Sequence, residues 1–452
     1  QYSYTEANMA ELSNYQGALN DIWRDGWPTL PVYREDGTFA VPQDNPRIST
    51  LFGDAAYWNP VANYKEVTTK SNVSRLLGDV YAEFQLAKGL TFKTNFGLDI
   101  ANKRDYNYTT SKITTSTGYG KGGNGYTKKM SRLTENILSY MNEWGDHRFT
   151  ATGVYSWQNY MYETLSISGN GFANDETGAW DMGQANRETV EYGSDKYENS
   201  LISWTGRVTY AYKDRYLLTA TARYDGSSRF GENNKWGFFP SIGLAWRASE
   251  EKFLAGNKVI TNLKVRGSFG VTGNQEIGNY KSLAQLKVDN YIYNDTEIQG
   301  FYETIGNPDL KWERANQFDI GIDLSLWNRI HVTADYYHRK TSDLLYNVPI
   351  PSTSGFSSML SNVGSVLNKG WELSITGNII DLNDLKIDAT VNLSRNTNKI
   401  KELYNDVQSI TLKSGLGLSS YLKVGESLNS RYALLADGII RTEEQLAAYR
   451  KI

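Results

Sequence analysis

The sequence predicts an all-β protein whose antiparallel strands cross a membrane as an up-and-down β-barrel. Three observations predict this fold class. Apolar and polar residues alternate with period two in many segments, short turns alternate with long polar loops, and no run of about 18 apolar residues offers a spanning helix. A polar overall composition agrees with such a barrel, because each strand turns half of its residues to a lumen.

The clearest alternation lies in residues 316–339, which read NQFDIGIDLSLWNRIHVTADYYHR. Apolar side chains take every second position: Phe318, Ile320, Ile322, Leu324 and Leu326, then Ile330, Val332, Ala334 and Tyr336. Polar or small residues stand between them, and a turn at 327–329 separates the halves. Successive side chains of a strand point to opposite faces, so we expect two strands with one apolar and one polar face.

The same pattern recurs along the chain. It is found at 90–100, 149–157, 204–212, 216–224, 263–271 and 385–393, and about 12 strands are expected between Arg75 and Lys401. In hydrocarbon every backbone N–H and C=O must be paired within the protein, so strands can span a membrane only as a closed barrel. Lipid would contact the apolar face. The polar face, expected to line the interior, includes Lys264, Arg266, Asp319, Asp323 and Asp335.

The connections between these segments fall into two classes. Short links are expected at 87–89, 145–147, 213–215, 327–329 and 383–384, with a somewhat longer link at 249–262. Long polar loops are expected at 101–129, 159–200, 272–311 and 342–368. In an up-and-down sheet this order puts all short turns at one end and all long loops at the other.

A soluble β-sandwich or propeller would also show alternation. Strands of such proteins average about 5 or 6 residues, whereas several alternating runs here exceed about 10. Aromatic residues gather at the ends of the runs: Trp144, Trp246, Trp327, Tyr336 and Tyr337. Such rings favour the membrane boundary, where an apolar body and a polar edge are both satisfied. We therefore favour the barrel over a soluble β-rich binding protein.

Composition and motifs argue against several kinds of partner and site. The net charge of -3 supplies no positive field for nucleic acid, and the absence of cysteine excludes disulfides and thiolate metal sites. The only histidines are His147, His331 and His338, without an HExxH motif, so no transition-metal site and no enzyme activity is expected. Acidic and amide groups of the long loops, such as Asn294 and Asp295, leave a structural calcium ion as the one cofactor to consider.

Two loop features bear on ligand binding. GxGxxG spacings occur at Gly118, Gly120 and Gly123 and again at Gly120, Gly122 and Gly125, but the motif needs a strand before it and a helix after it, so we expect a flexible loop. Aromatic residues of the long loops are candidate ligand contacts, because binding residues concentrate on loops. These candidates are Trp58, Trp180, Tyr280, Tyr291 and Tyr302.

Several blocks resemble the SusC/RagA family of TonB-dependent outer-membrane transporters of Bacteroidetes. From Thr221 the chain reads TARYDGSSRFGENNKWGFFPSIGLAWRASEEKFL, then LKVRGSFGVTGNQEIGNY and GNPDLKWERANQFDIGIDL. Further matches are RLLGDVYAEFQLAKGLTFKTNFGLDI, NVGSVLNKGWELSITGNI and ADGIIRTEEQLAAY. YDGSSRFG and NPDLKWE are specific to the family, whereas NKGWEL is more widely shared. The resemblance covers most of the chain.

The resemblance implies a barrel of about 22 strands with a plugged lumen, of which roughly 12 to 14 lie in this chain. Short turns would face the periplasm and long loops the cell exterior. The function implied is active import of oligosaccharides or peptides, with no bond made or broken. Import of iron chelates or cobalamin, and a nonenergised porin or adhesin, are the alternatives.

The resemblance also implies parts and partners. Residues 1–70 are expected to form a long extracellular loop region, 71–404 the strands and their loops, and 405–452 a further strand and loop, with the plug and the last strands absent from this chain. The expected partners are a SusD-like surface lipoprotein, the TonB complex, outer-membrane lipid and the oligosaccharide or peptide ligand. A dimer of SusC/SusD pairs is a further expectation.

Overall fold

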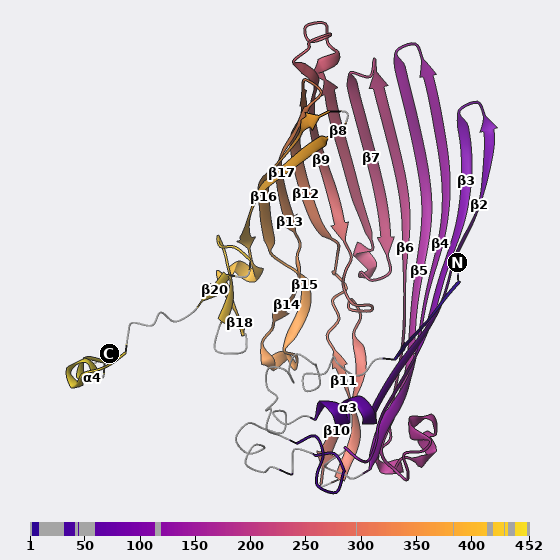
Figure 1. Cartoon of the computed structure of the whole chain (residues 1–452), viewed down its shortest axis with the longest axis vertical. Helices are drawn as coiled ribbons and strands as arrows, with labels where there is room; N and C mark the ends of the chain where they lie inside the picture. Colours follow the sequence, from indigo (N-terminus) through magenta and orange to yellow (C-terminus); the bar gives the residue numbers. More distant parts are fainter. Residues whose placement is uncertain are drawn as a thin grey trace. The chain divides into compact units, whose positions relative to one another are not determined.

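The computed structural model of the chain is shown in Figure 1. It describes residues 2–8, 31–40, 44, 59–113, 119–294, 296–382, 384–413, 419–428, 430–432 and 439–449. The contacts within the chain divide it into two compact units, which are described separately. The first unit is Gln1–Leu86, Thr91–Ile137 and Tyr155–Ile202, and the second is Ala87–Leu90, Leu138–Val154 and Ser203–Ile452.

The main element is a sheet of 13 strands in the order β1-β2-β3-β4-β5-β6-β7-β8-β9-β12-β13-β16-β17. Its strands are β1 (Tyr2–Asn8), β2 (Val67–Ala87), β3 (Leu90–Thr109), β4 (Gly120–Trp144), β5 (His147–Phe172), β6 (Glu191–Tyr212), β7 (Tyr216–Ser227), β8 (Trp236–Arg247), β9 (Ile260–Asn274), β12 (Glu313–Leu326), β13 (Ile330–Ser342), β16 (Ser365–Asp381) and β17 (Lys386–Glu402). Twelve of them, β2 to β17, fall in the range where about 12 are predicted. The all-β, up-and-down prediction is confirmed.

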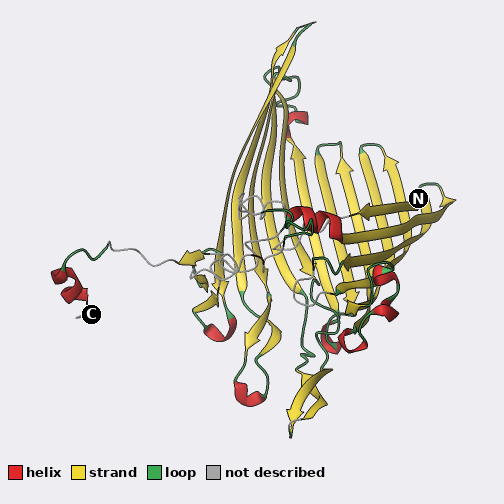
Figure 2. Ribbon diagram, turned by 60° about the horizontal axis from the view of Figure 1, so that its bottom comes forward, coloured by secondary structure: helices red, strands yellow, loops and turns green. Residues whose placement is uncertain are grey.

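The remaining elements are small (Figure 2). Three further sheets are β10 (Gln285–Tyr293) with β11 (Thr296–Thr304), β14 (Leu345–Pro349) with β15 (Ser358–Asn362), and β18 (Ser409–Lys413) with β19 (Ser419–Lys423) and β20 (Ser430–Tyr432). The helices are α3 (Pro60–Glu66) and α4 (Glu443–Tyr449), with short 3₁₀ turns between strands. None of the helices in the described part of the chain combines the length and apolar composition that a membrane crossing requires.

The register of β12 and β13 confirms the predicted faces. Ile322 lies opposite Ala334 and Asp323 opposite Thr333, so the two strands present the same alternation to each side. Ile320 is 46% exposed and Ile322 is 45% exposed, although both are large and apolar. A β-sandwich or propeller would bury these side chains in a core, so both soluble alternatives are wrong.

The short turns have the predicted positions. In the β12–β13 link Trp327 and Asn328 have positive φ angles of 52° and 51°, and the N–H of Arg329 donates to the carbonyl of Leu326 at 2.9 Å. Lys213 and Asp214 adopt the same conformation between β6 and β7. Two consecutive positive φ angles define the type I′ turn, whose twist matches that of paired strands. These turns need no glycine here.

The long loops are shorter than predicted, because the strands continue beyond the apolar alternation. The predictions of loop at 101–129 and 159–200 are wrong over most of their length, since β3 extends to Thr109, β4 begins at Gly120, β5 ends at Phe172 and β6 begins at Glu191. The predicted loops 272–311 and 342–368 contain the hairpins β10–β11 and β14–β15. A strand in water needs no apolar face, so its outer part lacks the pattern that identifies its membrane part.

The N-terminal region also contains more structure than a loop. Tyr2–Asn8 pairs antiparallel with β2, from Tyr2 opposite Leu76 to Asn8 opposite Lys70, and so joins the main sheet. Residues 31–40 form a small hairpin around the isolated bridge between Tyr33 and Phe39, and α3 follows it. The expected loop region 1–70 therefore includes a strand, a hairpin and a helix among its described residues. At the other end of the chain, Glu443–Tyr449 form the short helix α4.

Candidate functional site

The inner face of the second unit carries a network of ion pairs across three neighbouring strands. Arg266 on β9 contacts Asp323 on β12 at 3.3 Å and Asp335 on β13 at 2.7 Å, and Lys264 lies 3.8 Å from Asp323. About a third of each side chain is exposed. All four residues are on the face predicted to be polar, and the sheet brings them together because β9, β12 and β13 are consecutive neighbours. The two positive and two negative charges neutralise one another, so this inner face is polar but carries no strong electrostatic field of one sign.

A hollow of about 280 Å³ lies on this face beside the ion pairs. Its lining includes Thr219, Lys264, Arg266, Ser268 and Asp319. The Ser268 hydroxyl donates to the Asp319 carboxylate at 3.3 Å. Because donors and acceptors of both kinds face the hollow, it can bind a hydroxyl-rich or amide-rich molecule by hydrogen bonds.

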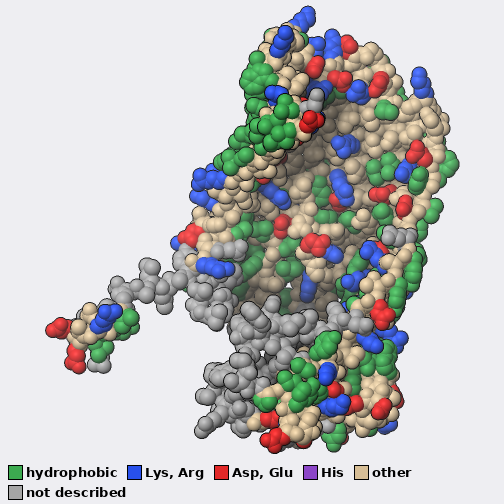
Figure 3. Space-filling view, in the orientation of Figure 1, with side chains coloured by type: hydrophobic (Ala, Val, Ile, Leu, Met, Phe, Trp, Pro, Cys, Tyr) green, Lys and Arg blue, Asp and Glu red, His purple; other side chains and the backbone are tan. Residues whose placement is uncertain are grey.

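The opposite face of the same strands has a different hollow. About 560 Å³ in volume, it is lined mainly by apolar side chains, among them Leu218, Leu244, Trp246, Val265 and Ile320. An apolar, exposed surface of this kind fits acyl chains and not a polar ligand. The space-filling view agrees: charged side chains of both signs are scattered over the face turned to the viewer, and hydrophobic side chains gather over the last strands of the sheet (Figure 3).

The two sequence blocks that carry the resemblance form a buried aromatic cluster at the loop end of this unit. Phe230, from YDGSSRFG, is 1% exposed, and the ring of Trp312, from NPDLKWE, packs against it at a tilt with ring centroids 4.9 Å apart. Phe239 packs edge-on against the Trp312 ring at 5.3 Å, and the indole N–H of Trp312 donates to the carbonyl of Lys235 at 3.0 Å. Gly231 lies so close to the Pro308 carbonyl that a Cβ would clash with it. These blocks therefore hold the β7–β8 loop against the segment before β12.

In the first unit the β5–β6 loop, residues 173–190, folds back onto the strands. Ala179 is fully buried and Ala185 is 6% exposed, and both pack in a cluster with Tyr106, Tyr108 and Phe172. The Asn124 amide donates to the Ala179 carbonyl. The loop is therefore held as a rigid layer, because backbone turns and side-chain contacts both fix it.

Asp175 pins this loop to the end of β3. Its carboxylate accepts hydrogen bonds from the Tyr108 hydroxyl at 2.9 Å and from the Ser111 hydroxyl at 2.7 Å, and from the Ser111 backbone N–H at 3.0 Å. Burial alone would raise the pKa of Asp175, but the hydrogen bonds from Ser111 and Tyr108 outweigh it, so the pKa is lowered. Burial, followed by the neighbouring Asp175 carboxylate, raises the pKa of Tyr108. The pair therefore stays Asp⁻ and neutral Tyr near neutral pH.

The glycine run of β4 is what allows this close packing, and the prediction of a flexible loop there is wrong. Gly120, Gly122 and Gly125 lie within β4. A Cβ on Gly122 would lie 2.7 Å from the Tyr108 ring and 2.9 Å from Ala179, and a Cβ on Gly120 would lie closer still to Tyr108, at 2.1 Å from its hydroxyl. The GxGxxG spacing thus reflects a packing surface, not a phosphate site. Gly118 lies outside the described residues.

The face on which the loop packs follows from the register of β3. Gly97 lies beside Leu133, and Gly125 lies beside Asp105, so β3 and β4 keep one offset along their length. Phe96, Tyr106 and Tyr108 are separated by even numbers and share a face. Phe96 is 49% exposed on the apolar side of the strand. The loop therefore covers the outward extension of the lipid-facing side.

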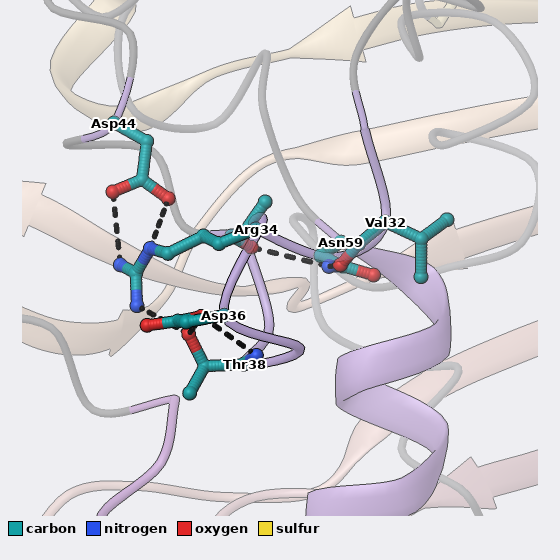
Figure 4. A network of polar contacts seen from close by, with 7 residues as sticks. Val32, Arg34, Asp36, Thr38, Asp44 and Asn59 are labelled. Atoms are coloured by element: carbon teal, nitrogen blue, oxygen red, sulfur yellow. Dashed lines mark hydrogen bonds and ion pairs between the residues drawn. The ribbon is translucent and has the colours of Figure 1, made fainter.

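A second polar network ties the N-terminal hairpin to α3 (Figure 4). The Arg34 guanidinium donates to both oxygens of Asp44, at 2.8 and 2.9 Å, and Thr38 donates to Asp36 through its hydroxyl at 2.6 Å. Asn59 caps α3 by accepting from the N–H of Ala62, while its amide donates to the carbonyls of Val32 at 2.7 Å and Ala40 at 3.1 Å. These contacts are structural, since each polar group already has a partner within the chain.

The predicted ligand contacts are spread over both units. Trp180, in the first unit, is 54% exposed and stacks on Tyr106 at 4.4 Å, with Arg104 5.3 Å from its ring. Tyr280, in the second unit, is 38% exposed and has a positive φ of 60°. Tyr291 lies on β10 and Tyr302 on β11, at separate levels of that hairpin. Trp58 lies outside the described residues. Ligand contact by these residues stays a prediction.

The side chains that could bind a metal ion were compared over the described part of the chain. No group of three or more His, Asp or Glu side chains within the described ranges is placed to hold an ion. The His147 ring lies 2.7 Å from the Tyr210 hydroxyl, and the His331 ring lies 2.9 Å from the Ser325 hydroxyl. Both histidines are therefore engaged in hydrogen bonds within the sheet.

Sequence reasoning missed the residues that fix the loops. Asp175, Tyr108 and Trp312 carry the contacts described above, yet none of them is a candidate in the sequence. The only available signal was the cluster of glycines at 120–125, because glycine in a strand interior marks a close approach of other atoms. That signal indicates packing but does not name the partner.

The sequence of the chain is similar to those of known proteins. A family described as "TonB dependent receptor-like, beta-barrel" matches residues 14–439. TonB-dependent receptor P26 of Formosa agariphila is 34% identical over 457 residues, which cover 99% of this chain and 45% of that protein. TonB-dependent receptor SusC of Bacteroides thetaiotaomicron is 32% identical over 404 residues, covering 83% of this chain and 39% of SusC.

Solved structures give the same result. The structure of the RagAB peptide transporter superposes with a TM-score of 0.73 at 29% sequence identity, over 80% of this chain and 40% of the matched chain. The chain thus spans less than half the length of these relatives.

Proposed function

Because the chain belongs to the TonB-dependent receptor-like β-barrel family of bacterial outer-membrane proteins, we propose that the protein imports oligosaccharides as the barrel of a SusC/SusD-type complex. The observation that carries this proposal is the two-faced sheet. Exposed apolar side chains such as Ile322 cover one face, and ion-paired polar side chains such as Arg266 cover the other. A barrel built from such strands encloses a wet path through lipid.

The chemistry of the inner wall supports a neutral, hydroxyl-rich ligand. Arg266 is matched by two carboxylates, and the nearby hollow offers hydroxyl, carboxylate and ammonium groups within a small space. Such a wall can exchange hydrogen bonds with sugar hydroxyls along the path. An uncompensated field of one sign would instead hold a charged ligand and slow its release.

Peptide import is the second candidate. It is favoured by the likeness to the RagAB peptide transporter, which covers 80% of this chain with a TM-score of 0.73. Backbone amides of a peptide could use the same donors and acceptors of the inner wall. The chemistry of the wall alone favours sugars, and the structural likeness favours peptides.

The proposed assembly follows from the family. A SusD-like surface lipoprotein would cover the outward mouth, and the TonB complex would supply energy through a plug. Two such pairs would form a dimer. Within this chain, 71–404 would supply strands and extracellular loops, with 1–70 and 405–452 contributing further extracellular segments.

Uptake by cells tests the proposal directly. A strain lacking the gene and a complemented strain would be compared for uptake of labelled oligosaccharides, peptides and a ferric chelate, each with and without functional TonB. We expect TonB-dependent oligosaccharide uptake only in the complemented strain. TonB-dependent peptide uptake alone would establish the second candidate. Uptake limited to the ferric chelate, or uptake independent of TonB, would overturn the proposal in favour of a siderophore receptor or a porin.

The proposed ligand contacts are tested in the same assay. Tyr280→Ala and Trp180→Ala should each raise the substrate concentration for half-maximal uptake, since an aromatic ring stacked on a sugar face is lost. Tyr346→Ala, which removes a ring stacked on Tyr404 and is not a proposed contact, serves as the control. Equal effects of all three would argue that the substitutions act through folding.

A further inference from the structure

A row of basic side chains lies directly beyond the apolar belt on the outer face of β13, β16 and β17. The belt ends at Tyr336, which lies opposite Trp371, which in turn lies opposite Arg395. Tyr336 and Trp371 are 41% and 44% exposed. Exposed aromatic rings at the end of an apolar strand face mark the level where hydrocarbon gives way to lipid headgroups.

What we call the basic patch consists of Arg395, at the level of these rings, and of the outer-face positions beyond it: His338, Lys340, Lys369 and Lys399. Lys369 is at its centre, opposite His338 on β13 and opposite Thr397 on β17. Arg395 and Lys399 flank Thr397 two residues to either side, so both are diagonal neighbours of Lys369. Diagonal neighbours in an antiparallel sheet lie about 7–8 Å apart. One phosphate group can therefore reach several of these side chains.

The basic patch has no counter-charge within the described residues. All five residues are exposed, and none of their charged or ring groups makes an ion pair or a hydrogen bond in that part of the chain. On the inner face of neighbouring strands, by contrast, Arg266 is paired with Asp323 and Asp335. Like charges in this arrangement repel one another, so the patch is complementary to an external anion.

We propose that the basic patch binds the phosphorylated headgroup of an outer-leaflet lipid. The patch continues a surface that is already in contact with lipid, and it lies at headgroup height, where anionic phosphates are available. Figure 3 shows lysine and arginine side chains beside the hydrophobic side chains of these last strands. At the same level on β9 the outer face carries Phe269, opposite Phe318, and no charge, so the site is local.

Binding of a labelled lipid tests this assignment. The whole receptor would be placed in phosphatidylcholine nanodiscs, and its affinity for fluorescent phosphatidic acid measured by energy transfer from tryptophan. The triple variant Lys369→Gln, Arg395→Gln, Lys399→Gln should bind at least about tenfold more weakly, since each juxtamembrane charge contributes to attraction of anionic lipid. Lys369→Arg should retain binding, because it keeps the charge.

Arg339→Gln is the matched control. Arg339 follows His338 on β13 and lies opposite Asn368, so it stands at the same height on the inner face. Its removal should leave lipid binding unchanged. The proposal is overturned if the triple variant binds phosphatidic acid like the unaltered protein, or if Arg339→Gln loses as much. If inorganic phosphate at the same concentration displaces the lipid, the patch is a site for a soluble anion and the proposal is overturned. If the triple variant has half the mass of the unaltered protein in detergent, the patch instead binds a second copy of the chain, which also overturns the proposal.

Discussion

The membrane part of the strands and the loop layer formed by residues 173–190 are specified by the sequence in different ways. On β12 every second side chain faces lipid, so any sufficiently apolar residue satisfies each position. In the 173–190 loop, Ala179 and Asp175 meet particular atoms of Tyr108, Asn124 and Ser111. The first region is specified by a repeating solvent boundary, and the second by individual contacts. Substitutions should therefore fail for different reasons in each.

The largest effect is expected from a charge placed on the lipid side. Val391→Arg should lower the free energy of unfolding by about 2 to 4 kcal/mol if Val391 lies near mid-bilayer, and Ile322→Arg should behave alike. Asn392→Arg is the control, because Asn392 is adjacent, is also exposed and lies on the inner face. Denaturant unfolding of the whole receptor in lipid vesicles would measure both. Equal losses for Val391→Arg and Asn392→Arg would refute the assignment of faces.

In the loop layer, adding a single methyl group should destabilise the packing of residues 173–190. Gly122→Ala places a Cβ 2.7 Å from Tyr108 and 2.9 Å from Ala179, and overpacking of this kind costs about 1 to 3 kcal/mol. Hydrogen exchange of residues 173–190 should rise in this variant. Gly125→Ala, whose Cβ would meet only Asp105 at 3.6 Å, should leave exchange unchanged. Unaltered protection in Gly122→Ala would contradict the packing described here.

A pH dependence is expected in the same layer. Because the pKa of Asp175 is lowered in the folded state, its stabilising contribution is complete above the unfolded value of about 3.9 and is lost as the pH falls through the folded value. After correction for the intrinsic exchange rate, which itself falls in acid, the protection of residues 173–190 against hydrogen exchange should therefore decrease in acid. Asp175→Asn should lower the free energy of local opening by about 1 kcal/mol at neutral pH, so exchange there should be faster. The same variant should abolish the acid dependence. A variant that keeps the acid response would assign it to another group.

The smallest effect is expected on the inner face. Arg266→Gln removes two ion pairs, but all three side chains remain about one-third exposed to a wet interior, so the loss should stay at about 1 kcal/mol or less. Vesicle unfolding at low and high salt would measure it, and added salt should shrink the difference between the two proteins. A loss as large as that of Val391→Arg would mean that this face is dry.

The two regions also differ in how far the sequence predicts them. Lipid enforces period two, so the strands, the type I′ turns at 213–215 and 327–329, and the inner position of Arg266 and Asp323 follow from pattern alone. Beyond the membrane both faces of a strand meet water. The apolar alternation therefore stops there, although β3 and β5 continue. The loop contacts depend on which side chain fits beside which glycine, and no periodicity encodes that. Ligand residues such as Tyr280 are of the same kind.

The great length of the strands carries one more consequence. At about 3.3 Å per residue, the 26 residues of β5 extend about 85 Å, far more than the 30 Å or so of hydrocarbon. The remaining length of β5 lies outside the hydrocarbon, so the β5–β6 loop stands well clear of the lipid. A single inserted residue would turn every later side chain to the wrong face unless a β-bulge absorbs it, as the register shifts at Ser325 and Asn378 do elsewhere in this sheet.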